Sequence, residues 1–153
     1  MMSTTWGQSN TPETLGTVDC GEFFPALDAD KFRRLYRIPV ELPGEVVLEQ
    51  LRLGAAAAIA SLESWRRGRA EATLAEVPQR EIGGTGVLVM FFERACFCLA
   101  KAELLRETVT VDRRPQAENA AKSGAETEEK YREFAADALS RICGVPIMEV
   151  DLL

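Results

Sequence analysis

The side chains of this sequence that could do chemistry do not form a recognisable catalytic arrangement. The chain has no histidine, which removes histidine-based proton transfer, Ser-His and Cys-His nucleophile pairs, and histidine metal ligands. Cys96 and Cys98 are spaced like a metal or redox pair, but residues two apart on a helix point to nearly opposite sides. We therefore expect buried, inert thiols, and no catalytic residue, metal ion, cofactor or enzymatic activity.

Three other groups of residues favour ordinary structural roles. The glycine cluster Gly83–Gly86 lacks the Lys-Ser/Thr pair of a phosphate-binding loop and follows no strand, so it indicates a turn. The carboxylates between residues 126 and 133 are mixed with basic residues, which is typical of a solvated helical face. Arg66, Arg67 and Arg69 suit the C-terminal end of a helix dipole, and contact with DNA or another anion is the alternative.

Composition and charge indicate one soluble globular domain that is not built to hold nucleic acid. The 153 residues are 46% hydrophobic and 27% charged, and a chain of this length can bury a substantial core. The formal net charge of −6 argues against sequence-independent DNA binding, which relies on clustered lysines and arginines. It fits a surface that DNA passes without binding. The four cysteines follow no secretory signal, so we expect free thiols in a reducing cytosol.

One stretch, residues 86–105, is the element that the others must cover. It predicts a helix that is apolar almost all round, and such a helix belongs in a protein core or in a membrane. A membrane-spanning helix needs about 20 mostly apolar residues, and Glu93, Arg94 and Lys101 interrupt this run. We therefore expect the central helix of a helical domain and no membrane association.

Three further helices are predicted around this central one. Apolar residues recur at helical spacing over residues 27–36, 45–69 and 116–143. Asp28 is placed to cap the first of them, and residues 108–115 predict a break before the last. The fold class that follows is all-α: a helical bundle of about four helices with an extended C-terminal segment.

The sequence divides into three parts. Residues 1–20 consist largely of Ser, Thr, Gly, Asn and Pro, and they predict a flexible N-terminal arm. Residues 21–145 carry the helical patterns and form the helical domain. Residues 146–153 follow the last helix and form an extended C-terminal segment.

The C-terminal segment alternates like a half-buried strand, with apolar side chains on one side and two carboxylates on the other. A lone amphipathic strand at a terminus can add to another chain, or it can lie as a tail across its own helices, and the pattern fits both. The candidate residues for contact with a neighbouring chain are Ile147, Met148, Glu149, Val150, Asp151, Leu152 and Leu153.

One sector of the central helix combines bulky apolar and charged side chains. Its members, projected at about 100° per residue, are Met90, Glu93, Arg94, Phe97, Lys101 and Leu104. Subunit interfaces often show such a mixture, so these six residues are candidates for contact with a neighbouring copy. The alternative is a core helix that its own chain buries on all sides. Burial of Phe97 within the chain would remove the support for the interface.

Several stretches of this sequence follow one another in a fairly specific order. They are Phe23-Phe24-Pro25 with Asp28 and Phe32-Arg33, the small-residue helix ending near Trp65, residues 72–78, Arg94-Ala95, residues 100–105 and Glu149–Leu153. In this order and at these separations, the chain from about Gly21 to Leu153 resembles the head completion proteins of contractile-tailed phages, the GPL family.

The resemblance implies a structural virion protein that acts after DNA packaging at the portal vertex. It implies a head-to-tail adaptor in a homo-oligomeric, dodecameric ring under the portal, which extends the DNA channel and allows tail attachment. The partners would be the portal protein, which residues 147–153 would contact unless they bind a neighbouring subunit, and a tail or tail-terminator protein. DNA would pass without sequence-specific binding. The location would be the head-tail junction of the virion, and the host cytoplasm during assembly.

A small helical regulatory or DNA-binding protein is the alternative that the residues themselves allow. It would need a recognition helix and a complementary basic face. The sequence offers only the cluster from Arg66 to Arg69 for that purpose.

Overall fold

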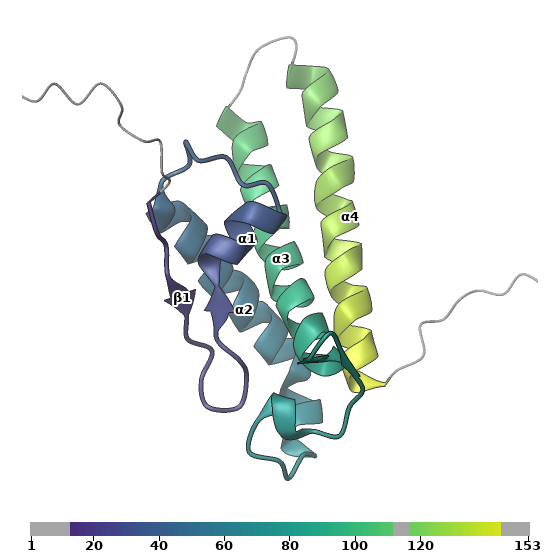
Figure 1. Ribbon diagram of the computed structural model, residues 1–153. Helices are drawn as coiled ribbons and strands as arrows, with labels where there is room; N and C mark the ends of the chain where they lie inside the picture. Colours follow the sequence, from purple (N-terminus) through teal and green to yellow (C-terminus); the bar gives the residue numbers. More distant parts are fainter. Residues whose placement is uncertain (1–12, 112–116, 145–153) are drawn as a thin grey trace, which may run out of the picture.

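The computed structural model describes residues 13–111 and 117–144, with residues 108–111 and 117–126 described by their backbone alone. Four helices make up most of this part of the chain (Figure 1). They are α1 (Ala29–Leu35), α2 (Gly44–Arg67), α3 (Val87–Val111) and α4 (Ala117–Cys143). The predicted all-α bundle is confirmed, and no described helix is long and apolar enough to cross a membrane.

Helix α3 lies at the centre of the bundle, as its sequence predicts. It packs along α2 on one side and α4 on the other (Figure 1). The short α1 also reaches α3, because the Phe32 ring lies 5.1 Å from the Phe97 ring, centroid to centroid. The side chains that α3 buries are Phe92, Ala95, Cys96, Phe97, Cys98, Ala100, Ala102 and Leu104.

Small residues let α2 and α3 approach each other closely. A Cβ atom on Gly54 would lie only 2.8 Å from the Cys96 carbonyl oxygen and 3.1 Å from the Ala100 backbone nitrogen. Ala55 and Ala58, on the same side of α2, are buried. The backbones therefore meet at Gly54 with no room for a side chain between them.

Two pairs of short strands accompany the helices. Strand β1 (Thr17–Val18) pairs antiparallel with β2 (Leu27–Asp28), directly before α1. Strands β3 (Glu81–Ile82) and β4 (Thr85–Gly86) form a hairpin that leads into α3, after the 3-10 turn η1 (Leu74–Glu76). The predicted glycine turn is confirmed: Gly83 and Gly84 connect this hairpin with φ angles of +61° and +82°, which only glycine adopts easily.

The structure differs from the sequence prediction in several places. Strand β3 directly precedes the glycine cluster, where no strand was predicted. Residues 13–20, expected in a flexible arm, belong to the folded body, because β1 pairs with β2 and Val18 is buried. Helix α3 continues to Val111, so the predicted break at 108–115 begins later than expected. Asp28 does cap α1: its carboxylate accepts hydrogen bonds from the backbone N–H groups of Asp30 and Lys31.

Candidate interaction surface

The cysteines are placed for packing and not for chemistry. Cys96 and Cys98 are buried, and the Cys98 Sγ lies 3.7 Å from the Tyr36 hydroxyl oxygen. Burial raises the pKa of both thiols, which keeps them protonated and unreactive. All four cysteines are free, and no cluster of acidic or cysteine side chains in the described chain could hold a metal ion.

The basic cluster at the end of α2 is engaged within its own chain. Each of its arginines contacts an aromatic ring or a carboxylate. The pairs are Arg66 over the Phe23 ring at 4.0 Å, Arg67 with Glu63 at 2.6 Å, and Arg69 with Glu71 at 2.8 Å. These contacts use the cations that a DNA-binding surface would present, so the structure gives the alternative of a DNA-binding protein no support.

The structure does not bring the six candidate residues of the α3 sector to one surface. Phe97 is 1% exposed and lies between the Phe32 and Tyr36 rings, with centroid distances of 5.1 and 5.5 Å. Leu104 is buried as well. Lys101 is half-buried, and burial lowers the pKa of its ammonium group. Phe97 and Leu104 are therefore core residues. Their burial removes the support for a contact with a neighbouring copy at these two positions.

The other three candidates, Met90, Glu93 and Arg94, do lie at the surface and line a groove. The α3 groove, as we call it, has a volume of about 380 Å³ and lies between α1, the β3–β4 hairpin and α3. Its lining residues include Leu35, Tyr36, Ile82, Met90, Glu93 and Arg94, and the buried Phe97 also borders it.

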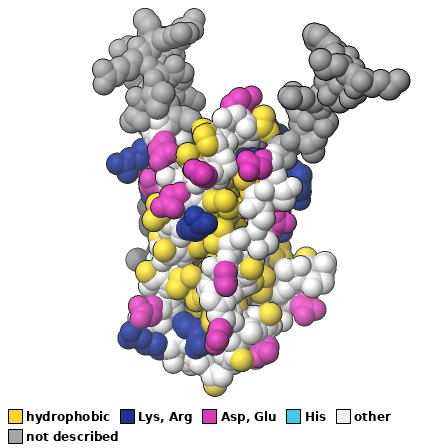
Figure 2. Space-filling model, turned by 90° about the vertical axis from the view of Figure 1, so that its left-hand side faces the viewer, with side chains coloured by type: hydrophobic (Ala, Val, Ile, Leu, Met, Phe, Trp, Pro, Cys, Tyr) yellow, Lys and Arg dark blue, Asp and Glu magenta, His cyan; other side chains and the backbone are white. Residues whose placement is uncertain are grey.

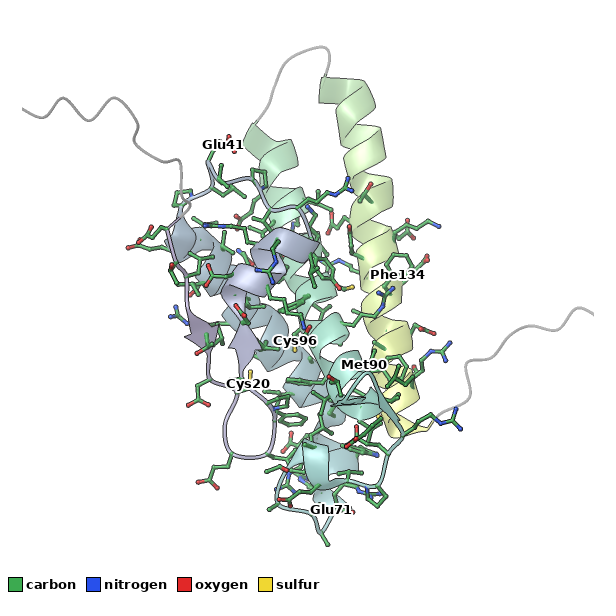
Figure 3. The ribbon with its side chains drawn as sticks, in the orientation of Figure 1. Cys20, Glu41, Glu71, Met90, Cys96 and Phe134 are labelled. Carbon is green, nitrogen blue, oxygen red and sulfur yellow. The ribbon has the colours of Figure 1, made fainter. Side chains whose placement is uncertain are left out.

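Charged residues of the α3 groove make defined contacts. The Lys31 ammonium on α1 pairs with the Glu93 carboxylate on α3 at 2.6 Å. The Arg94 guanidinium lies 5.0 Å from the centroid of the Phe134 ring on α4. Figure 3 shows Met90 on α3 and Phe134 on the neighbouring α4. The groove and Phe134 thus join α1, the hairpin, α3 and α4 into one continuous surface.

This surface collects exposed apolar side chains. Leu35, Ile82 and Met90 line the groove with exposed fractions of 58%, 56% and 43%, and Phe134 beside it is 39% exposed. Clustered exposed apolar residues of this kind mark an interaction site more often than single ones do. Leu35 and Ile82 were not predicted from the sequence as surface residues. The exposure of Ile82 could have been predicted from its position beside Gly83, since a side chain at a hairpin turn lies away from the core.

A second apolar surface lies on α2. Leu53 is 52% exposed, and the exposed residues that follow it on the helix are small: Ala56, Ala57 and Ala60. Figure 2 shows the side of the body on the left in Figure 1, where hydrophobic side chains gather along the middle and charged side chains surround them. Small side chains allow close approach of another helix, although they name no partner.

Helix α4 ends as its sequence predicts. Gly144 follows its last residue, Cys143, with a φ of +69°, which is the left-handed conformation common after helix ends. The candidate residues Ile147, Met148, Glu149, Val150, Asp151, Leu152 and Leu153 lie outside the described residues.

Comparison with known proteins identifies the family whose sequences this chain matches. The family model described as phage head completion protein (GPL) matches residues 18–153 of the chain. The head completion/stabilization protein of Escherichia phage P2 is 28% identical over 127 residues, which cover 81% of this chain and 75% of that protein. No solved structure matches the chain.

Proposed function

Because the chain belongs to the family of phage head completion proteins (GPL), we propose that it completes the head as a ring-forming adaptor beneath the portal. In this role it is a structural protein without enzymatic activity or cofactor. The ring is dodecameric, extends the DNA channel below the portal, and presents the surface to which the tail attaches after packaging. The match of the family model across residues 18–153 is the observation that carries the proposal.

The surfaces of the body are compatible with a ring. A closed ring of identical subunits uses two different patches that meet head to tail. The chain offers the α3 groove, with Met90, Glu93 and Arg94, and separately the row of α2 that begins at Leu53. We propose the first of these as a subunit contact through Met90, Glu93 and Arg94 alone, since Phe97 and Leu104 are buried and Lys101 is half-buried.

The ends of the protein supply its other contacts. We propose that residues 147–153 bind the portal or a neighbouring subunit through their alternating apolar side chains, since a strand of this kind can add to another chain. The opposite surface of the ring meets the tail or a tail-terminator protein. The net charge of −6 lets DNA pass the channel without being held.

Phage particles provide the test. A phage that lacks this protein is complemented with the full chain or with a chain truncated before Ile147, and the particles are imaged by electron microscopy. The full chain should appear as a ring under the portal and restore joined heads and tails. The truncated chain should fold, by circular dichroism, yet leave heads without tails. Density anywhere other than the head-tail junction would refute the adaptor role, and normal joining by the truncated chain would refute the assignment of residues 147–153.

A further inference from the structure

The α3 groove leaves three large apolar side chains uncovered. Leu35, Ile82 and Met90 line it, and each is at least 43% exposed. Its volume of about 380 Å³ is within the range of roughly 300 to 1,000 Å³ found for ligand-binding pockets. We propose that, in the free protein, this groove binds the chain's own C-terminal segment, residues 147–153.

The described chain ends close to the groove. The Arg141 guanidinium in the last turn of α4 lies 5.8 Å from the centroid of the Phe91 ring, and Phe91 is itself a lining residue of the groove. Gly144 ends the described chain one turn later. Residues 145–153 can span roughly 30 Å when extended, at about 3.3 Å per residue. The groove is therefore within reach without any change in the helical body.

The pattern of the segment matches the lining of the groove. In an extended segment, Met148, Val150 and Leu152 lie on one side and recur about every 7 Å. That side can cover the exposed apolar side chains of the groove. The other side of the segment, with two carboxylates, stays at the rim and in contact with water.

The charges of the segment and of the groove rim are also complementary. The Arg94 guanidinium stacks on Phe134, and within the described residues it has no carboxylate partner. Glu149 and Asp151 would bring carboxylates to this rim. Lys31 already pairs with Glu93, so Arg94 is the cation that such a carboxylate would meet.

The consequence for assembly rests on the proposed function. If residues 147–153 bind the portal, they must leave the groove, and Met90 and Arg94 then become available to a neighbouring subunit. The free protein would not form rings in solution, because its own segment covers the contact. Ring formation would begin where the portal removes that segment.

The test follows the oxidation of Met90 in the full-length protein, by dilute peroxide and mass spectrometry. A covered methionine oxidises more slowly than an exposed one, so the V150S/L152S variant should show roughly a threefold or larger increase in the Met90 rate. The E149Q/D151N variant should raise the rate as well, through loss of the carboxylate partners of Arg94. Equal Met90 rates in the wild type and V150S/L152S would overturn the proposal, and an unchanged rate in E149Q/D151N would overturn the pairing with Arg94.

Two controls separate this result from other causes. The L53S variant changes an exposed apolar residue on α2 and should leave the Met90 rate unchanged. Light scattering on the same samples establishes the oligomeric state. Protection of Met90 that grows with protein concentration would show binding between copies and would overturn the intramolecular contact. Because the measurement needs no portal and no particle, its outcome is independent of the complementation experiment.

Discussion

Asp30 in the first turn of α1 holds the two residues directly before strand β1. Its Oδ1 accepts a hydrogen bond from the Leu15 N–H at 3.0 Å, and its Oδ2 accepts one from the Gly16 N–H at 3.1 Å. The bond from Leu15 is the main reason that the pKa of Asp30 is lowered, with smaller contributions from Gly16 and the nearby charges of Arg33 and Arg34. The ionised carboxylate is therefore the form that stabilises the fold.

We predict that Asp30→Asn lowers the free energy of unfolding by about 1 kcal/mol at neutral pH, because one charged acceptor is lost. A folded pKa below the unfolded value of about 3.9 gives stability that is fully present above that pH. The stability is lost as the pH falls through the folded pKa. Urea unfolding should therefore show a difference in unfolding free energy between wild type and variant at pH 7, and this difference should become smaller near pH 3. Glu22→Gln, at an exposed residue, is the control, and a difference that stays constant with pH would contradict the argument.

Gly54 shows a different residue-scale effect, in which packing outweighs helix propensity. Gly→Ala inside a helix normally stabilises it by up to about 1 kcal/mol. At Gly54 the new methyl would lie 2.8 Å from the carbonyl oxygen of Cys96, which is backbone and cannot turn away. We predict that Gly54→Ala destabilises the protein by about 1–3 kcal/mol in urea unfolding. Gly68→Ala, at the end of α2 with a contact of 3.5 Å, should change little; equal effects of the two substitutions would refute the close contact.

At the scale of an element, α3 carries core and surface residues in the same helical sector. Phe97 is 1% exposed, whereas Met90, two turns earlier, is 43% exposed. We predict that Phe97→Ala costs about 3–5 kcal/mol of unfolding free energy, because it leaves a cavity beside Phe32. Met90→Ala should cost less than about 1 kcal/mol. Thermal and urea unfolding of both variants would measure this, and similar losses would mean that the sector is uniformly buried or uniformly exposed.

The helices were predictable because each shows its own local signal. Apolar side chains recur at helical spacing along α2 and α4. The Asp28 cap and Gly144 mark helix ends that depend only on nearby residues. The membership of α3 in the core followed from its apolar composition. The end of α3 was placed too early, because Thr108–Val111 are β-branched residues of low helix propensity that nonetheless continue the helix.

The surface of α3 and the strand β1 were not predictable in the same way. A helix that is apolar almost all round has no periodic difference that separates Phe97 from Met90, so only the position of α1 decides which one is covered. Strand β1 pairs with β2, and Leu15 before it bonds to Asp30, 15 residues away in the sequence. The α3 groove likewise needs Leu35 and Ile82 from two separate elements.

At the scale of the whole molecule, the described chain enters and leaves at opposite ends. Leu15 lies against the first turn of α2, and Gln50 in α2 donates to the Glu107 carboxylate near the end of α3 at 2.6 Å. Arg141 in the last turn of α4 instead stacks on Phe91 near the start of α3. Phe91 and Glu107 are 16 residues apart on α3, which is about 24 Å along the helix at 1.5 Å per residue. Figure 1 shows the described chain beginning beside one end of the bundle and ending at the other.

The charge of the whole molecule leads to a prediction about DNA. The net charge is −6, and the arginines at the end of α2 are held by Glu63, Glu71 and the Phe23 ring. Phosphate binding requires several free cations on one face, so we predict no retardation of duplex DNA in a gel shift even at low salt.

A variant with added positive charge is the control for the predicted lack of DNA retardation. Glu63→Lys with Glu71→Lys releases Arg67 and Arg69 and adds two cations to the same end of α2. This variant should retard DNA, and its affinity should fall as salt rises, with a slope near −0.9 for each phosphate contact. Salt-dependent retardation by the wild type would instead mean that the arginines exchange their carboxylate partners for phosphates. In that case the lumen of the proposed ring would hold DNA and not merely let it pass.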